Sequence, residues 1–119
     1  MLHMGSYLLN GFSPAMLEPS VSSVQFVEIP MTVLCDALES IKLVNAIGHK
    51  STVNLINQLC KTNLKENRIQ VKLQAGDDAY IVVVTERLEE GKVLSDEELK
   101  QFLEQGKIKI YHAEVYEIS

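Results

Sequence analysis

A glycine and a histidine, Gly48 and His49, precede the amphipathic part of the stretch NAIGHKSTVNLINQLC, which spans residues 45–60. An imidazole titrates near pH 6.5, so His49 can give or take a proton at cellular pH. Apolar residues at helical spacing predict a helix that begins near Ser51 or Thr52, and its first turn would offer amide groups and a positive dipole end to a phosphate. Gly48 would let the backbone approach a ligand closely. The plainer interpretation makes His49 an ordinary loop residue and the two hydroxyls simple helix caps.

A second candidate group lies in ERLEEGKVLS, residues 86–95, directly after an almost wholly apolar run. Arg87 offers a fixed, permanently charged fork for a phosphate, and Glu90 can orient it or hold a substrate hydroxyl. Ligand sites of α/β sheets gather at the carboxyl ends of strands, which is where Arg87 is expected. The alternative is a solvated charged loop, whose ion pairs would each contribute about 0 to 1 kcal/mol.

The other side chains of reactive type have simpler explanations. Ser13 precedes Pro14 and is expected to cap a short helical turn, because no base accompanies it as a nucleophile. His112 falls within an alternating strand and is expected on the sheet surface. Cys35 and Cys60 lie in apolar contexts without metal-ligand spacing, so we expect two buried thiols and need no disulfide. The sequence contains no phosphate-loop or zinc motif, so we expect no metal and no other cofactor.

Hydrophobic periodicity predicts the elements that would position these groups. The runs SYLLNGF at 6–12, VSSVQFVEI at 21–29 and KIKIYHAEVYEI at 107–118 are expected to be strands. RIQVKLQ at 68–74 alternates, AGDD turns the chain and AYIVVVTERL returns, which predicts a hairpin whose second strand is central. SDEELKQFLEQG at 95–106 predicts a helix with a capping box at Ser95 and Glu98 and a stop at Gly106. Pro30 and MTVLCDALES at 31–40 make the end of the second strand uncertain from the sequence. IKLVNAI at 41–47 fits either the end of a strand or a loop packed on the core.

Length and charge limit the class of protein. The 119 residues suit one domain, 1–119, and we expect an α/β fold with a mixed β-sheet flanked by helices. The opening MLHMGS partly resembles an expression remnant over residues 1–5, so His3 receives no role. With 11 basic and 16 acidic residues the net charge is −5, which argues against binding long duplex DNA. No run of the sequence is long enough to span a membrane, and we expect a cytoplasmic protein.

Four strings in order, LLNGFSPAML, NAIGHKSTVNLINQLC, ENRIQVKL and ERLEEGKVLSDEEL, resemble a family of small proteins from archaeal viruses and bacterial mobile elements. Characterised members are anti-CRISPR ring nucleases, which degrade cyclic tetra-adenylate, the messenger of type III CRISPR defence. The resemblance covers nearly the whole chain from Tyr7 onward. It is strongest at IGHKST and RLEEGKVLS and weakest between Val21 and Lys42.

The resemblance implies a homodimer with one cyclic tetra-adenylate across its two-fold axis and a metal-independent reaction. A ribose 2′-hydroxyl of the ligand would attack the adjacent phosphate and leave a 2′,3′-cyclic phosphate. His49 would protonate the departing 5′-oxygen, Arg87 would steady the phosphate, and Glu90 matches the family glutamate. Ser13 and Arg68 match positions that line the ligand in the family.

The sequence departs from the family pattern just before Arg87. A Ser-Gln pair often precedes the arginine in the family, whereas this chain has Thr85 and Glu86. A carboxylate beside Arg87 would weaken phosphate affinity. The departure keeps open an alternative function, a non-catalytic module that binds the nucleotide or acts through protein contacts. A transcription factor is disfavoured by the net charge and by the lack of a basic recognition helix.

Overall fold

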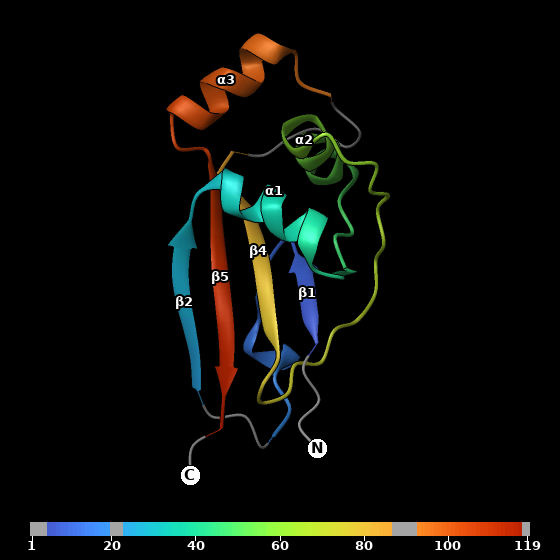
Figure 1. Cartoon of the computed structure of the whole chain (residues 1–119), viewed down its shortest axis with the longest axis vertical. Coiled ribbons are helices and arrows are strands. Elements are labelled where there is room, and N and C mark those ends of the chain that lie inside the picture. The colour runs from blue at the N-terminus through green and yellow to red at the C-terminus, as the bar shows by residue number, and fades with distance from the viewer. Residues whose placement is uncertain (1–4, 20–22, 87–92, 118–119) are drawn as a thin grey trace.

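The computed structural model describes residues 5–19, 23–86 and 93–117 and shows one five-stranded sheet with three α-helices (Figure 1). The sheet order is β2-β5-β4-β1-β3. In chain order the elements are β1 Ser6–Leu9, the 3-10 helix η1 Pro14–Met16, β2 Ser23–Ile29, α1 Met31–Ser40, β3 Val44–Asn45, α2 Lys50–Cys60, β4 Asp78–Val84, α3 Asp96–Glu104 and β5 Ile108–Tyr116. The expectation of a single α/β domain with a mixed sheet is confirmed.

The sheet is mixed because β1 runs parallel to both of its neighbours, while β5 runs antiparallel to both of its own. Leu8 of β1 pairs with Asn45 of β3 on one side and with Tyr80 of β4 on the other. On the far side of β4, β5 pairs along seven residues and then forms a second seven-residue ladder with β2. The loops that follow β1, β3 and β4 therefore all lie at the same end of the sheet, beyond the carboxyl ends of these strands.

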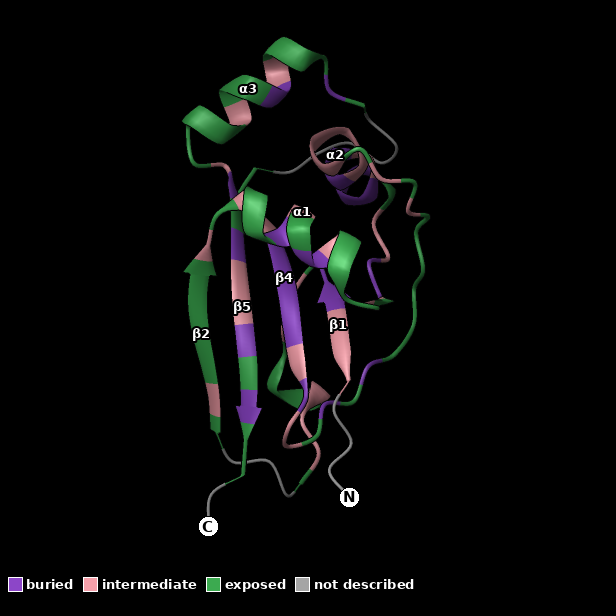
Figure 2. Ribbon diagram, in the orientation of Figure 1, coloured by how far each residue is buried: buried purple, intermediate pink, exposed green. Residues whose placement is uncertain are grey.

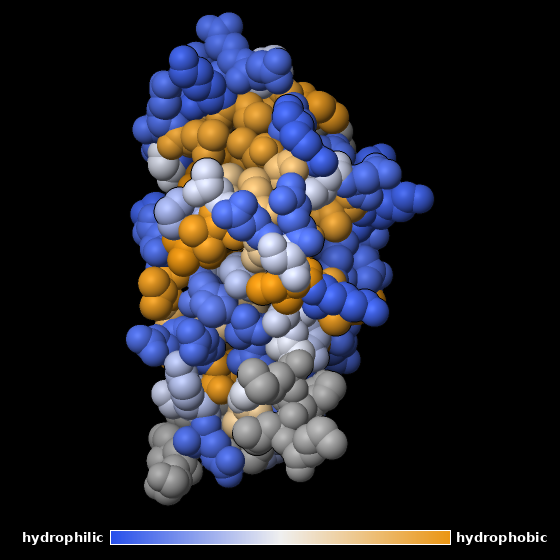
Figure 3. Space-filling view, viewed as in Figure 1, coloured by the Kyte–Doolittle hydropathy of each residue, from blue (hydrophilic) through white to orange (hydrophobic). Residues whose placement is uncertain are grey.

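Buried apolar side chains form one cluster on each face of the sheet. Strand β5 contributes to both, because the face on which its side chains are buried changes along the strand. Near its start, Ile108 and Ile110 are buried on the face that α1 and α2 cover. Near its end, Ala113 and Val115 are buried on the opposite face. Figure 2 shows buried segments alternating with more exposed ones along β5. On the helix face, apolar side chains gather between α3 and α1 (Figure 3).

Several predicted elements are confirmed with small shifts. Helix α3 begins after Ser95, whose side chain accepts from the Glu98 amide while the Glu98 side chain accepts from the Ser95 amide, as the capping box predicts. Ser13 caps η1 and Pro14 is its first residue. Helix α2 begins at Lys50, one residue before the expected start, and its N-cap residue is His49. Residues 31–40, to which the sequence pattern assigns no element, form α1.

The predicted hairpin between residues 68–74 and β4 is wrong. Both edges of β4 are occupied, by β1 and by β5, so no edge remains for segment 68–74. This segment instead runs extended and makes a single parallel bridge between Leu73 and Leu17. Val71 and Leu73 are 6 % and 0 % exposed, so the alternation that suggested a strand reflects burial of one side of the segment without pairing to β4. The expected turn is present, with Gly76 at φ +95° and the Asp77 amide bonded to the Gln74 carbonyl.

The expectation of two separate buried thiols is also wrong. Cys35 of α1 and Cys60 of α2 form a disulfide, with their Cα atoms 5.0 Å apart, and both residues are half-buried. This pair cannot be read from the sequence, because the contact depends on α1 packing beside α2 and residues 31–40 carry no clear helix pattern. Among the described residues, no helix has both the length and the apolar run that crossing a bilayer requires.

We expect the disulfide to stabilise the fold by about 3 kcal/mol, because it closes a loop of 25 residues in the unfolded chain. The double variant Cys35→Ala with Cys60→Ala should lower the Tm by roughly 10 °C in thermal unfolding followed by circular dichroism. Reductant should lower the Tm of the wild type and leave that of the double variant unchanged. An equal response of both proteins to reductant would contradict the assignment.

Candidate functional site

The candidate site forms where β3 leaves the sheet and α2 begins. The chain turns directly after β3, because the Asn45 side-chain oxygen accepts from the Ile47 amide at 3.1 Å, and Ile47 itself is fully buried. Gly48 and His49 follow and lead into α2. The first turn of α2 contains no acidic residue, so the positive end of its dipole is not offset locally. This helix start suits an anion.

His49 is held by the first turn of α2. Its Nδ1 lies 3.2 Å from Oγ1 of Thr52, a residue only 5 % exposed. The plainer interpretation, in which the hydroxyls of Ser51 and Thr52 cap the helix, is wrong: both residues lie inside the first turn and are buried, and the His49 side chain, at the N-cap, makes no capping hydrogen bond. The buried Thr52 hydroxyl fixes which way the ring faces, because it engages one nitrogen of the imidazole.

Arg68 lies directly against Gly48. Its Nη2 donates to the Gly48 carbonyl at 3.1 Å, and a Cβ added at Gly48 would lie 3.1 Å from both Cβ and Nε of Arg68. The close approach that Gly48 permits is therefore occupied by the arginine side chain. Gly48, His49 and Arg68 form one cluster, in which an exposed guanidinium and an imidazole stand beside a helix N-terminus.

The remaining predicted site residues lie elsewhere. Ser13 is exposed and its Oγ accepts from the Ala15 amide at 3.3 Å, as expected for a cap. Figure 1 shows η1 toward the end of the sheet that holds both termini, whereas α2 lies toward the other end. The described chain thus does not bring Ser13 to the His49 cluster. Arg87 and Glu90 lie outside the described residues.

The chain that leads toward Arg87 is anchored to β5. The Thr85 amide donates to the Lys107 carbonyl at 2.7 Å, and Glu86 forms an ion pair with the Lys107 ammonium at 2.6 Å. Lys107 also stands 5.1 Å above the Phe102 ring. The carboxylate that departs from the family pattern therefore has a cationic partner, which offsets its charge.

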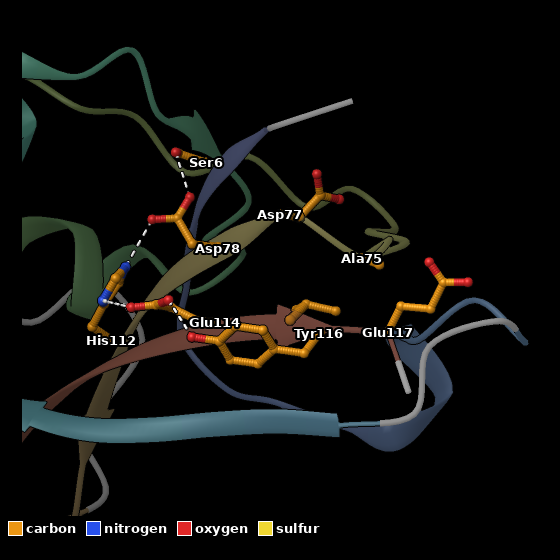
Figure 4. Close-up of a pocket in the computed structure, with 10 residues that line it drawn as sticks. Ser6, Ala75, Asp77, Asp78, His112, Glu114, Tyr116 and Glu117 are labelled. Carbon is orange, nitrogen blue, oxygen red and sulfur yellow. Dashed lines mark hydrogen bonds and ion pairs between the residues drawn. The ribbon is translucent and has the colours of Figure 1, made fainter. Parts of the chain in front are cut away.

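A separate polar cluster lies at the helix-free end of the sheet, and sequence reasoning missed it. His112 Nε2 lies 2.8 Å from Asp78, whose other oxygen accepts from the Ser6 hydroxyl at 2.5 Å (Figure 4). His112 Nδ1 lies 3.8 Å from Glu114, which accepts from the Tyr116 hydroxyl. His112 is on the sheet surface, as expected, but the residues of the cluster come from three strands, β1, β4 and β5. Strand register, which pairs Asp78 with Glu114, was the missing information.

This second cluster lines a cavity of about 580 Å³ whose charged side chains are mainly carboxylates. The Tyr80 ring stacks on His112 with centroids 4.7 Å apart, and burial, followed by the charges of Asp78 and Glu114, raises the pKa of the Tyr80 hydroxyl. The carboxylates contact opposite ring nitrogens of His112, so the three groups do not converge on one metal position. Within the described part of the chain, no group of three or more metal-ligand side chains is arranged to hold an ion. The cavity is acidic and does not suit a phosphate.

The chain is similar to proteins of several viruses. A model of the STIV B116-like family matches residues 6–111. ORF116 of Acidianus filamentous virus 1 is 70 % identical over 115 residues, which cover 97 % of this chain and 99 % of that protein. Protein 26 of Sulfolobus islandicus filamentous virus is 29 % identical over 96 residues, covering 80 % of this chain and 81 % of its own length.

A solved structure has the same fold. B116 of Sulfolobus turreted icosahedral virus superposes with a TM-score of 0.83 at 43 % sequence identity, covering 92 % of this chain and 98 % of its own. Because the family model covers most of the chain and a relative of nearly equal length is 70 % identical, the protein belongs to the STIV B116-like family of archaeal virus proteins.

Proposed function

We propose that the protein is a metal-independent phosphodiesterase that cleaves cyclic tetra-adenylate and so antagonises type III CRISPR signalling in the host cytoplasm. The observation that carries the proposal is the cluster at the start of α2, where the Arg68 guanidinium donates to the carbonyl of Gly48, the residue before His49, and the first turn of the helix contains no acidic residue. This arrangement offers a proton donor and positive charge at one place, as cleavage of a phosphodiester requires.

The proposed reaction takes its nucleophile from the substrate. A ribose 2′-oxygen bonds to the adjacent phosphorus, the bond from phosphorus to the 5′-oxygen breaks, and a 2′,3′-cyclic phosphate remains. The 2′-hydroxyl proton passes to water, while the His49 imidazolium gives its proton to the departing 5′-oxygen. Arg87 would steady the phosphate, as the family resemblance implies, and Glu90, which matches the family glutamate, would hold the attacking hydroxyl. The protein supplies alignment, charge and one proton.

Thr52 determines which ring nitrogen of His49 acts. Because Nδ1 faces the Thr52 hydroxyl, proton donation to the substrate goes through Nε2. A buried hydroxyl that holds the other nitrogen also keeps the ring in one orientation, as a hydrogen bond to the second ring nitrogen of a catalytic histidine commonly does. No protein nucleophile is needed, which agrees with Ser13 serving as a cap.

A homodimer would complete the ligand site. Cyclic tetra-adenylate carries four phosphates, and one described cluster provides few cations for them. A two-fold axis through the ligand would present each cluster twice, which explains how a chain of net charge −5 binds a polyanion. Ser13, which lies apart from His49 within one chain, would then contact the ligand from the other copy.

The alternative function is a module that binds the nucleotide without cleaving it. Glu86, the departure from the family pattern, favours this alternative because it places a carboxylate next to Arg87 in the sequence. The ion pair between Glu86 and Lys107 weakens that argument. Turnover, measured directly, separates the two functions.

Purified protein should convert cyclic tetra-adenylate to linear products with 2′,3′-cyclic phosphate ends, with or without chelator, in a chromatographic assay. His49→Ala should lower the rate by about 10²- to 10⁴-fold, the usual contribution of a general acid. His112→Asn is the matched control, since this half-exposed histidine belongs to the acidic cluster. Binding without turnover would support the alternative function, and full activity of His49→Ala would refute the proposed mechanism.

Gly48→Ala should weaken ligand binding by about tenfold, because the new methyl group would displace Arg68 and break its bond to the Gly48 carbonyl; an effect of about 1.4 kcal/mol corresponds to this factor. Gly11→Ala is the control, since a Cβ there meets nothing within 4 Å. Affinities from isothermal calorimetry with the His49→Ala background, which blocks turnover, provide the measurement. Equal affinities for both glycine variants would contradict the role of Arg68.

Lys107→Gln should weaken ligand binding several-fold, because it leaves the Glu86 carboxylate without its partner near Arg87. Stability should change by about 1 kcal/mol or less, as for other exposed ion pairs. The double variant Lys107→Gln with Glu86→Gln should restore affinity. If the double variant binds as weakly as Lys107→Gln alone, the carboxylate is not the cause.

A further inference from the structure

We infer that Asn45 and Asn67 are positioning residues that hold the Gly48–His49 loop in its working geometry. The inference rests on the proposed function of His49, and it adds residues that act through that histidine. The cluster at the start of α2 is built on a loop, and a loop needs bonds outside α2 to hold it. Those bonds come from the segment 65–68, which returns past the loop.

Asn45 ends β3 and bonds in two directions. Its side-chain oxygen accepts from the Ile47 amide, which turns the chain toward α2. Its Nδ2 donates to the Lys65 carbonyl at 2.7 Å, which ties the turn to the returning segment. One side chain therefore sets both the direction of the loop and its distance from residues 65–68.

Asn67 completes the connection from the other side. Its Nδ2 donates to the Asn45 carbonyl at 2.8 Å, and its backbone amide donates to the Ile47 carbonyl at 2.7 Å. The next residue, Arg68, donates to the Gly48 carbonyl. Carbonyls of three residues in the loop 45–48 thus accept hydrogen bonds from two consecutive residues, which leaves the backbone before His49 little freedom.

The returning segment is itself fixed to α2, so the connection is rigid. The Asn57 side chain accepts from the Leu64 amide at 2.8 Å and donates to the Leu64 carbonyl at 2.9 Å. Helix α2 ends at Cys60, and the next residue, Lys61, adopts left-handed φ +56° and turns the chain back. The loop that enters α2 is therefore bonded to the segment that leaves it.

Hydrogen bonding, not hydrophobic burial, explains the presence of Asn67. The residue is exposed, so its side chain adds little apolar contact, and its amide group is used on the Asn45 carbonyl. Loss of this bond should leave the fold intact and should let the loop move. Misplacing a catalytic group by about 1 Å can lower a rate about 10²-fold, so small movements matter.

The test compares Asn67→Ala with Asn63→Ala, which removes an exposed asparagine four residues away on the same segment. In single-turnover and steady-state assays with cyclic tetra-adenylate, Asn67→Ala should lower kcat by about tenfold or more while KM changes less than about threefold. Asn45→Ala should act in the same direction, and Asn63→Ala should match the wild type. The Tm of Asn67→Ala should fall by only a few degrees, as for one exposed hydrogen bond.

A double variant separates positioning from a general loss of structure. In the His49→Ala background, Asn67→Ala should cause no further loss of rate, because its effect passes through the histidine. An equal loss in both backgrounds, an effect on KM alone, or no effect would overturn the inference.

A measurement without substrate tests whether Asn67 holds the loop, separately from the proposed function. Amide hydrogen exchange followed by NMR should show faster exchange at residues 47–49 in Asn67→Ala and wild-type exchange there in Asn63→Ala. If the wild type does not cleave the ligand, the proposed function fails and this comparison alone decides whether Asn67 holds the loop. Unchanged exchange in Asn67→Ala would overturn the inference.

Discussion

Strand β1 lies between two parallel partners, and this pairing determines where the rest of the molecule can place a site. Leu8 and Leu9 are 0 % and 2 % exposed, so the strand is buried on both faces, as the short apolar run predicts. Because β3 and β4 both run parallel to it, the loops after all three strands emerge at one edge. The start of α2 and the chain that leads toward Arg87 reach the same end of the molecule for this reason.

The same sheet separates two electrostatic environments. The end of the sheet at which the parallel strands β1, β3 and β4 terminate carries His49, Arg68 and the start of α2, which together favour an anion. The opposite end carries Asp78, His112 and Glu114, which favour a cation or stay bonded to one another. The change of buried face along β5 produces this second cluster, since Ile108 and Ile110 fill the helix face only at the first end. A histidine alone therefore does not identify an anion site in this chain. The charge of the residues packed around the histidine determines which kind of ligand the site favours.

Local chemistry made part of the fold predictable. The Ser95–Glu98 capping box, the alternation of β5 and the apolar run of β4 each act within a few residues, and all three elements appear as expected. Contacts between distant residues were not predictable in the same way. Segment 68–74 has the pattern of a strand, yet it cannot pair with β4 because β1 and β5 occupy both edges of that strand. The disulfide likewise depends on α1 meeting α2. At the candidate site, Gly48 and His49 could be chosen from sequence, whereas the contact of Arg68 with Gly48 spans 20 residues and needed the fold.

Helix α2 is restrained at both of its ends, and this matters for the proposed reaction, whose nucleophile belongs to the substrate. The disulfide fixes Cys60 to α1, the bonds of Asn57 fix the departing chain, and Ile47, fully buried, anchors the approach to His49. Val53, Leu55 and Ile56 hold the middle of the helix in the core. A helix held in this way cannot slide or rotate without breaking covalent or buried contacts. The ordering of His49, the proposed proton donor, is thus completed when the chain folds, so the binding energy of a ligand can go to aligning its own hydroxyl and phosphate.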